Sequence, residues 1–177
     1  MTSRSTTSPP CLGFLTVIEN ADLGLLGGYL LLNAAGRPLE FHCTAPIRPN
    51  RTQEILYGPT LRPFLYGEQI GQTLLTKSKL TPVVICTDSE PVLATREFTD
   101  TPVVMILGAT AGSSSNVPYA QFQLASNQVA AAAGHSDDEQ AVRTNWPALA
   151  DHLNLLEPFE RIREALEEAQ KSARQAA

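Results

Sequence analysis

Asp88 is the residue whose position in the sequence is best suited to chemistry. It follows the apolar run of residues 82–87 and precedes Ser89, Glu90 and Pro91, where a helix can begin. A β-branched run bounded by turn residues indicates a buried strand, and open α/β sheets place ligands and catalytic groups at the carboxyl ends of such strands. The simpler alternative is that Asp88 caps the following turn.

Other acidic residues and one histidine stand near the ends of predicted elements. Glu19 follows the first apolar run, and Glu54 lies in what should be the first turn of a helix, where it also complements the helix dipole. His135 is followed closely by Asp137 and two further acidic residues. This segment either brings a histidine and a carboxylate to a catalytic site or starts a helix through residue 143.

Several other kinds of site have no support in the sequence. It contains no G-x-S-x-G nucleophile motif and no phosphate-binding loop. Cys11, Cys43 and Cys86 lack the spacing of metal ligands, so we expect buried, reduced thiols and a cytoplasmic location.

The N-terminal half predicts strands followed by a helix. Residues 12–18 form an apolar run, and residues 28–32 and 39–43 flank a glycine-containing turn, which predicts a β-hairpin. A short helical turn is expected after Arg51, and a cleaner helix over residues 67–78. The glycines between residues 24 and 28 are expected to permit an unusual turn before the hairpin.

The C-terminal half predicts two more strands and then helices. The same Thr-Pro-Val-Val pattern, at residues 81–84 and 101–104, opens the apolar runs 83–86 and 103–107. These runs should be neighbouring strands, joined by a short helix over residues 89–98 or by a hairpin. Residues 108–116 are expected to form a loop. Residues 119–134 fit either a strand and a helix or one helix. Amphipathic helices are predicted after Asn145 and after Glu157.

These elements indicate an α/β protein with a mixed sheet opened by an antiparallel β-hairpin, helices packed on it, and amphipathic C-terminal helices. At 177 residues and 43% apolar content, the chain suits one soluble domain over residues 11–177, with a flexible tail over residues 1–10 and a helical segment from about residue 145. The longest apolar stretch is interrupted by glycines and is too short to span a membrane. The net charge of −5 disfavours nucleic-acid binding by bulk electrostatics.

Over about residues 12–107 the order of these elements resembles the ribonuclease H-like fold family. The resemblance is carried by Gly27-Gly28-Tyr29 at the second strand, by Asn50-Arg51 with Glu54, and by Thr87-Asp88-Ser89. It implies that an Asp on the first strand, a Glu on the first helix and the Asp ending the fourth strand bind two divalent metals for phosphodiester hydrolysis. In this sequence the candidate ligands are Glu19, Glu54, Asp88 and, late in the chain, Asp137, with His135 as a further catalytic candidate. The first strand itself lacks an Asp.

Two functions follow, and the incomplete carboxylate set favours the first. The chain is predicted to be a non-catalytic interaction module, possibly a degenerate ribonuclease H-like domain, with a protein partner on the stripe formed by Leu153, Leu156, Phe159, Ile162 and Leu166. The alternative is a nuclease dependent on Mg²⁺ or Mn²⁺, which would bind nucleic acid and would require Glu19, Glu54 and Asp88 to converge. The hairpin and the following helix also give a weaker resemblance to longin- or roadblock-like adaptors.

Overall fold

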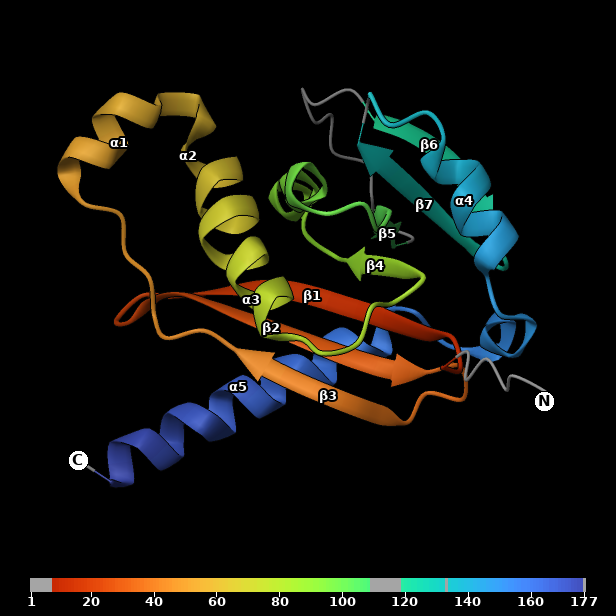
Figure 1. Ribbon diagram of the computed structural model, residues 1–177. Helices are drawn as coiled ribbons and strands as arrows, with labels where there is room; N and C mark the ends of the chain where they lie inside the picture. The colour runs from red at the N-terminus through yellow and green to blue at the C-terminus, as the bar shows by residue number, and fades with distance from the viewer. Residues whose placement is uncertain (1–7, 109–118, 133, 177) are drawn as a thin grey trace, which may run out of the picture.

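The computed structural model describes residues 8–108, 119–132 and 134–176, which form a seven-stranded mixed sheet with helices on both faces (Figure 1). The strand order is β3-β2-β1-β4-β5-β7-β6. The strands are β1 (Cys11–Asn20), β2 (Gly24–Asn33), β3 (Pro38–Cys43), β4 (Val84–Thr87), β5 (Val103–Leu107), β6 (Tyr119–Leu124) and β7 (Asn127–Ala132). The predicted α/β class with a mixed sheet is confirmed.

The first five strands include the hairpin and the pair of neighbouring strands that the sequence predicts. β1, β2 and β3 are antiparallel neighbours, whereas β4 pairs in parallel with both β1 and β5. The predicted hairpin is therefore present as β2 and β3, and the two Thr-Pro-Val-Val segments lead into adjacent parallel strands. The segment between them is helical, as one of the two alternatives proposed.

Helical segments cover the two faces of the sheet (Figure 1). One face carries η2 and η3, whose apolar side chains pack with Leu15, Tyr29 and Ile85. The other face carries α4 and α5, which pack with Leu12, Phe14 and Cys86. The segments are α1 (Arg51–Tyr57), η1 (Gly58–Thr60), α2 (Leu61–Pro63), the π-helical η2 (Phe64–Gln72), α3 (Thr73–Lys77), η3 (Glu90–Phe98), α4 (Asp138–Asn145), η4 (Ala148–His152) and α5 (Glu157–Gln175).

Residues 119–132 differ from both predicted alternatives, because they form the antiparallel hairpin of β6 and β7. Strand β7 also pairs with β5, which buries Val129, Ala130 and Ala131 between the helical layers. These tertiary contacts outweigh the helical preference of an alanine-rich segment. The loop predicted over residues 108–116 lies, apart from Gly108, outside the described residues, as do residues 1–7 of the predicted tail.

The C-terminal helices also differ from the prediction. The helix expected after Asn145 is only the short 3₁₀ turn η4, whereas α5 is long and amphipathic. The prediction of a partner-binding stripe is wrong for its members on α5, because Phe159, Ile162 and Leu166 are each at most 1% exposed and lie against the sheet. Of the other two members, Leu153 is partly buried and Leu156 is 40% exposed. This face of α5 is therefore part of the core and is not available to a protein partner.

Two consecutive glycines of β2 allow this close packing on both faces. A Cβ atom on Gly27 would lie 2.1 Å from Ile70 Cγ2 of η2, and one on Gly28 would lie 2.3 Å from Ile162 Cγ2 of α5. Because neighbouring strand residues point to opposite faces, each glycine makes room for one helix. Gly27 and Gly28 thus serve helix packing, whereas the sequence had suggested a role in a turn.

We predict that Gly27→Ala will lower the free energy of unfolding by about 1–3 kcal/mol, because the added methyl group must displace Ile70 and η2. Urea denaturation followed by circular dichroism measures the change. Gly108→Ala is the control, since its Cβ atom would meet only Leu156 Cδ1 at 3.9 Å, and it should change stability by less than about 0.5 kcal/mol. Equal stability of the two variants would contradict this role of Gly27.

Candidate functional site

Asp88 lies at the end of β4, where a side chain of β1 and a side chain of α5 meet it. The Thr16 hydroxyl donates a hydrogen bond to Asp88 Oδ1 at 2.6 Å, and Arg163 forms an ion pair with Oδ2. The Asp88 side chain is 15% exposed, and Thr16 is buried. Both carboxylate oxygens therefore have partners from other elements.

Asp88 does not make the turn-capping contact that was its simpler explanation. The N–H of Ser89 donates instead to the Thr87 hydroxyl oxygen at 3.1 Å, which stabilises the turn after β4. The side chain of Ser89 does not cap η3 within the described residues. Asp88 instead links β4 to β1 and α5 through its contacts with Thr16 and Arg163.

Glu19, near the end of β1, belongs to a different group of residues. Its Oε1 accepts hydrogen bonds from the Tyr66 hydroxyl at 2.6 Å and from Arg62 Nη2 at 2.8 Å. The Arg62 guanidinium also lies 5.3 Å from the centre of the Tyr66 ring, at a distance suited to a cation–π contact. Burial, and next the bond to Glu19, raise the pKa of Tyr66 to about 12.

Glu19 and Asp88 lie on opposite faces of the sheet. Tyr66, which holds Glu19, packs in the core on the η2 face, whereas Arg163 reaches Asp88 from α5 on the other face. The parallel register of β1 and β4 pairs Phe14 with Cys86, both of which pack on the α5 face. Two residues further along each strand, Thr16 and Asp88 point to that same face. The convergence of Glu19 with Asp88 that a shared metal site requires is therefore not found.

Glu54, on α1, lines the same cleft as Glu19. Glu19 and Glu54 both line a cleft of about 550 Å³ between the β1–β2 turn, the loop before α1, and η2. Arg48, Arg62 and Tyr66 also line it, and Glu54 forms an ion pair with Arg51 at 3.1 Å. Glu19, Glu54 and Asp88, three of the four predicted carboxylate ligands, are thus each paired with a different arginine.

His135 and Asp137 lie in the segment that joins β7 to α4. His135 Nε2 is 3.3 Å from Oε1 of Glu97, which lies in the last turn of η3, and Asp137 is exposed immediately before α4. The next residue, Asp138, is buried and forms an ion pair with Arg96. Strands β4 and β5 separate β7 from β1 in the sheet, so this segment belongs to a different region from Glu19.

The residues around Asp88 do not fit the pair of divalent metals that the resemblance implies. Such metals need several oxygen ligands of high negative charge, whereas Asp88 is accompanied by a threonine and an arginine. In the described part of the chain, no group of three or more His, Cys, Asp or Glu side chains is arranged to hold a metal ion. No helix in this part is long and apolar enough to cross a bilayer.

The sequence did not reveal three residues that contact the predicted carboxylates, namely Thr16, Arg163 and Tyr66. Thr16 could have been found by aligning the predicted first and fourth strands in parallel, which brings it beside Asp88. Arg163 follows Ile162 on an amphipathic helix and has the pattern of an ordinary solvent-facing residue. Only the packing of α5 on the sheet identifies it.

We predict that Arg163→Met will destabilise the protein by about 1–2 kcal/mol, because it leaves a largely buried carboxylate without its cation. Asp88→Asn should cost less, since the half-exposed Arg163 remains hydrated. The double variant should be more stable than the sum of the two single effects implies, by about 1 kcal/mol. Urea denaturation of all four proteins gives this coupling, and strictly additive effects would show that the ion pair contributes nothing.

The bond between Tyr66 and Glu19 has a consequence at high pH. The raised pKa keeps the folded protein protonated at Tyr66 between about pH 10 and 12, where the unfolded chain loses that proton. This stabilisation is therefore full below about pH 10 and decreases as the pH rises toward 12. Glu19→Gln should lower the pKa of Tyr66, as measured by the ultraviolet absorbance of the phenolate, with Tyr66→Phe identifying the transition. An unchanged titration in Glu19→Gln would refute the contribution of this bond.

No protein-family model matches the chain, and no curated protein matches it in sequence. Among solved structures, Endonuclease V from Bacillus subtilis has a TM-score of 0.47 and 10% identity, and the match covers 92% of this chain and 82% of that one.

Endonuclease V from Ciona intestinalis, in complex with DNA containing an inosine, has a TM-score of 0.39 and 12% identity, covering 58% and 47% of the two chains. Marinitoga piezophila Argonaute, in complex with a guide RNA, has a TM-score of 0.33 and 13% identity, covering 68% and 22%. Because all three TM-scores are below 0.5, the fold of this chain rests on its own strand order.

Proposed function

We propose that this chain is a non-catalytic α/β interaction domain, a degenerate member of the ribonuclease H-like architecture, in which an internal ion pair takes the place of a metal site. The observation that carries the proposal is the contact of Asp88 with Thr16 and Arg163. An arginine beside Asp88 supplies positive charge at the point where the resemblance expects a metal cation. We infer that such a domain binds a protein partner.

The strand arrangement supports the same interpretation. β1 lies between β2 and β4, and Asp88 ends β4 beside β1, which is the setting that the resemblance expects for a carboxylate pair. Thr16 occupies the position on β1 that faces Asp88, where a metal site would need an acidic residue. Arg163 then adds a positive charge late in the chain, where the resemblance would expect a carboxylate.

The alternative is a phosphodiester hydrolase dependent on Mg²⁺ or Mn²⁺ and acting on nucleic acid. It would draw its ligands from Asp88, Glu54, Glu19 and Asp137, with His135 assisting catalysis. Against it stand the opposite faces of Glu19 and Asp88 and the separate arginine partner of each of the first three carboxylates. The geometry therefore favours the interaction domain.

We predict that the wild-type protein gives no Mn²⁺ or Mg²⁺ binding signal in calorimetry and does not cleave DNA or RNA oligonucleotides in the presence of Mn²⁺. The double variant Thr16→Asp/Arg163→Asp should gain Mn²⁺ binding, with a dissociation constant of about 1 mM or below. The physical reason for this gain is that the two introduced carboxylates would then lie beside that of Asp88 on one face of the sheet. Thr16→Asp alone is the matched control, because Arg163 remains in place and should still oppose the metal.

Two results would decide against the interaction domain. The first is hydrolysis by the wild-type protein that is lost in Asp88→Asn. The second is Mn²⁺ binding by the wild-type protein that both Asp88→Asn and Glu19→Gln abolish, because it would require ligands from both faces to act together. Circular dichroism of each variant separates loss of a site from loss of the fold.

A further inference from the structure

We infer that the arm, defined as residues 45–63, is a docking surface for an acidic protein segment that carries apolar side chains. This inference deepens the proposed function and rests on it. The arm contains the loop after β3 together with α1, η1 and α2, and it extends away from the sheet beyond the β1–β2 turn (Figure 1).

The outer end of the arm carries large apolar side chains that the fold itself does not bury. Every residue of α1 is exposed or half-exposed, and Ile55 and Leu56 are 64% and 77% exposed. In the described part of the chain they are the two most exposed of the large hydrophobic side chains. Adjacent exposed Ile and Leu side chains on a projecting helix are typical of a contact surface.

Local contacts hold α1 in shape without using these two side chains. Asn50 and Gln53 form a reciprocal capping box, with bonds of 2.8 and 3.0 Å. The rings of Tyr57 and Phe64 stack with their centres 4.0 Å apart, which ties the end of α1 to η2. A seven-residue helix is marginal by itself, so these contacts fix the helix in place and leave Ile55 and Leu56 pointing outward.

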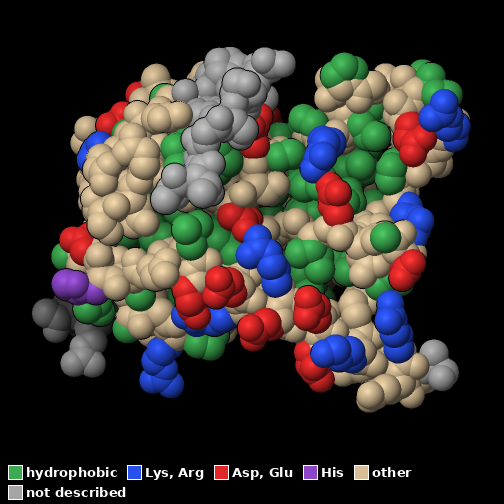
Figure 2. Space-filling model, turned by 180° about the vertical axis from the view of Figure 1, so that it is seen from behind, with side chains coloured by type: hydrophobic (Ala, Val, Ile, Leu, Met, Phe, Trp, Pro, Cys, Tyr) green, Lys and Arg blue, Asp and Glu red, His purple; other side chains and the backbone are tan. Residues whose placement is uncertain are grey.

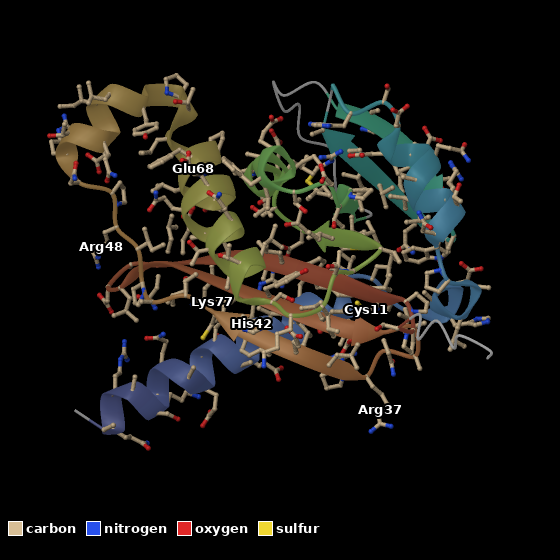
Figure 3. The ribbon with its side chains drawn as sticks, viewed as in Figure 1. Cys11, Arg37, His42, Arg48, Glu68 and Lys77 are labelled. Atoms are coloured by element: carbon tan, nitrogen blue, oxygen red, sulfur yellow. The ribbon has the colours of Figure 1, made fainter. Side chains whose placement is uncertain are left out.

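The arm is basic, although the whole chain has a net charge of −5. It contains three arginines, Arg48, Arg51 and Arg62, and one acidic residue, Glu54. Arg51 and Arg62 keep 82% and 63% of their side chains exposed despite their ion pairs. Arg48 projects from the loop before α1 (Figure 3), and its guanidinium donates to the backbone of the β1–β2 turn.

The arm also borders the cleft described above. Seen from behind, hydrophobic side chains are visible between the side that carries the arm and the rest of the molecule (Figure 2). Leu25, Ile47 and Leu65 contribute apolar atoms to the cleft, while Arg48 and Arg62 stand among its charged groups. A segment bound at Ile55 and Leu56 would continue toward this cleft, where apolar side chains lie beside two arginines and the carboxylates of Glu19 and Glu54.

These features favour an acidic protein segment over other occupants. A second copy of the chain would bring one basic arm against another, which opposes association by like charge. Nucleic acid is bound mainly through many Lys or Arg contacts to phosphates, whereas here two aliphatic side chains dominate the exposed end. An acidic segment with apolar side chains matches both the arginines and the pair Ile55 and Leu56.

The test is selection of peptides from a random phage-displayed library on the full-length protein. We expect enriched peptides to combine Asp or Glu with Leu, Ile, Phe or Trp. In fluorescence anisotropy with labelled peptides, Ile55→Ser/Leu56→Ser should weaken binding by about tenfold or more. Arg51→Glu should weaken it further in that background at low salt. Leu149→Ser, which changes a side chain that is 58% exposed on η4, is the matched control and should bind as the wild type does.

The inference is overturned if no peptide is enriched, if the enriched peptides are not acidic, or if Ile55→Ser/Leu56→Ser binds them as the wild type does. Binding of phosphatidylserine vesicles or single-stranded DNA through the arm, without peptide binding, would also overturn it and assign the arm to that partner. If no peptide binds and the wild-type protein also gives no Mn²⁺ binding signal, only the docking surface is refuted. Hydrolysis that depends on Asp88 would instead refute the interaction domain.

Discussion

The fold depends on the absence of side chains at two consecutive positions of β2. Gly27 and Gly28 face opposite sides of the sheet, and each receives one isoleucine from a helix, Ile70 of η2 or Ile162 of α5. With a larger residue at either position, the corresponding helix would have to move outward. Gly27 and Gly28 therefore determine how closely each helical layer packs on the sheet. Both glycines lie on β2, the middle strand of the antiparallel part of the sheet.

The same constraint positions the polar contacts on each face. Ile70 and Tyr66 are one turn apart on η2, so seating Ile70 against Gly27 brings the Tyr66 hydroxyl to Glu19. Ile162 precedes Arg163 on α5, so seating Ile162 against Gly28 brings the guanidinium to Asp88. Two acidic residues near the same end of the sheet thus become parts of two separate contacts. The sheet between them explains why neighbouring carboxylates do not form one site.

Much of the fold could be predicted from local patterns, and most of the site could not. The apolar runs of β1, β4 and β5 are local signals, as is the glycine-containing turn between β2 and β3, and the strands follow these signals. β7 lacks such a signal, because its alanines fit a helix equally well until they pair with β5. Thr16 becomes a partner of Asp88 only through the parallel register, and Arg163 only through the docking of α5. The carboxylates themselves are visible in sequence, but the faces to which they point are not.

The ion pair between Asp88 and Arg163 joins residues separated by 75 positions in the chain. During synthesis, β1 to β5 emerge before residue 163, so Asp88 lacks its ion pair with Arg163 until α5 has been made. The packing of α5 on this face of the sheet is therefore one of the later steps in folding. A chain that stops before α5 would expose Asp88 and the apolar side chains that α5 covers on this face of the sheet.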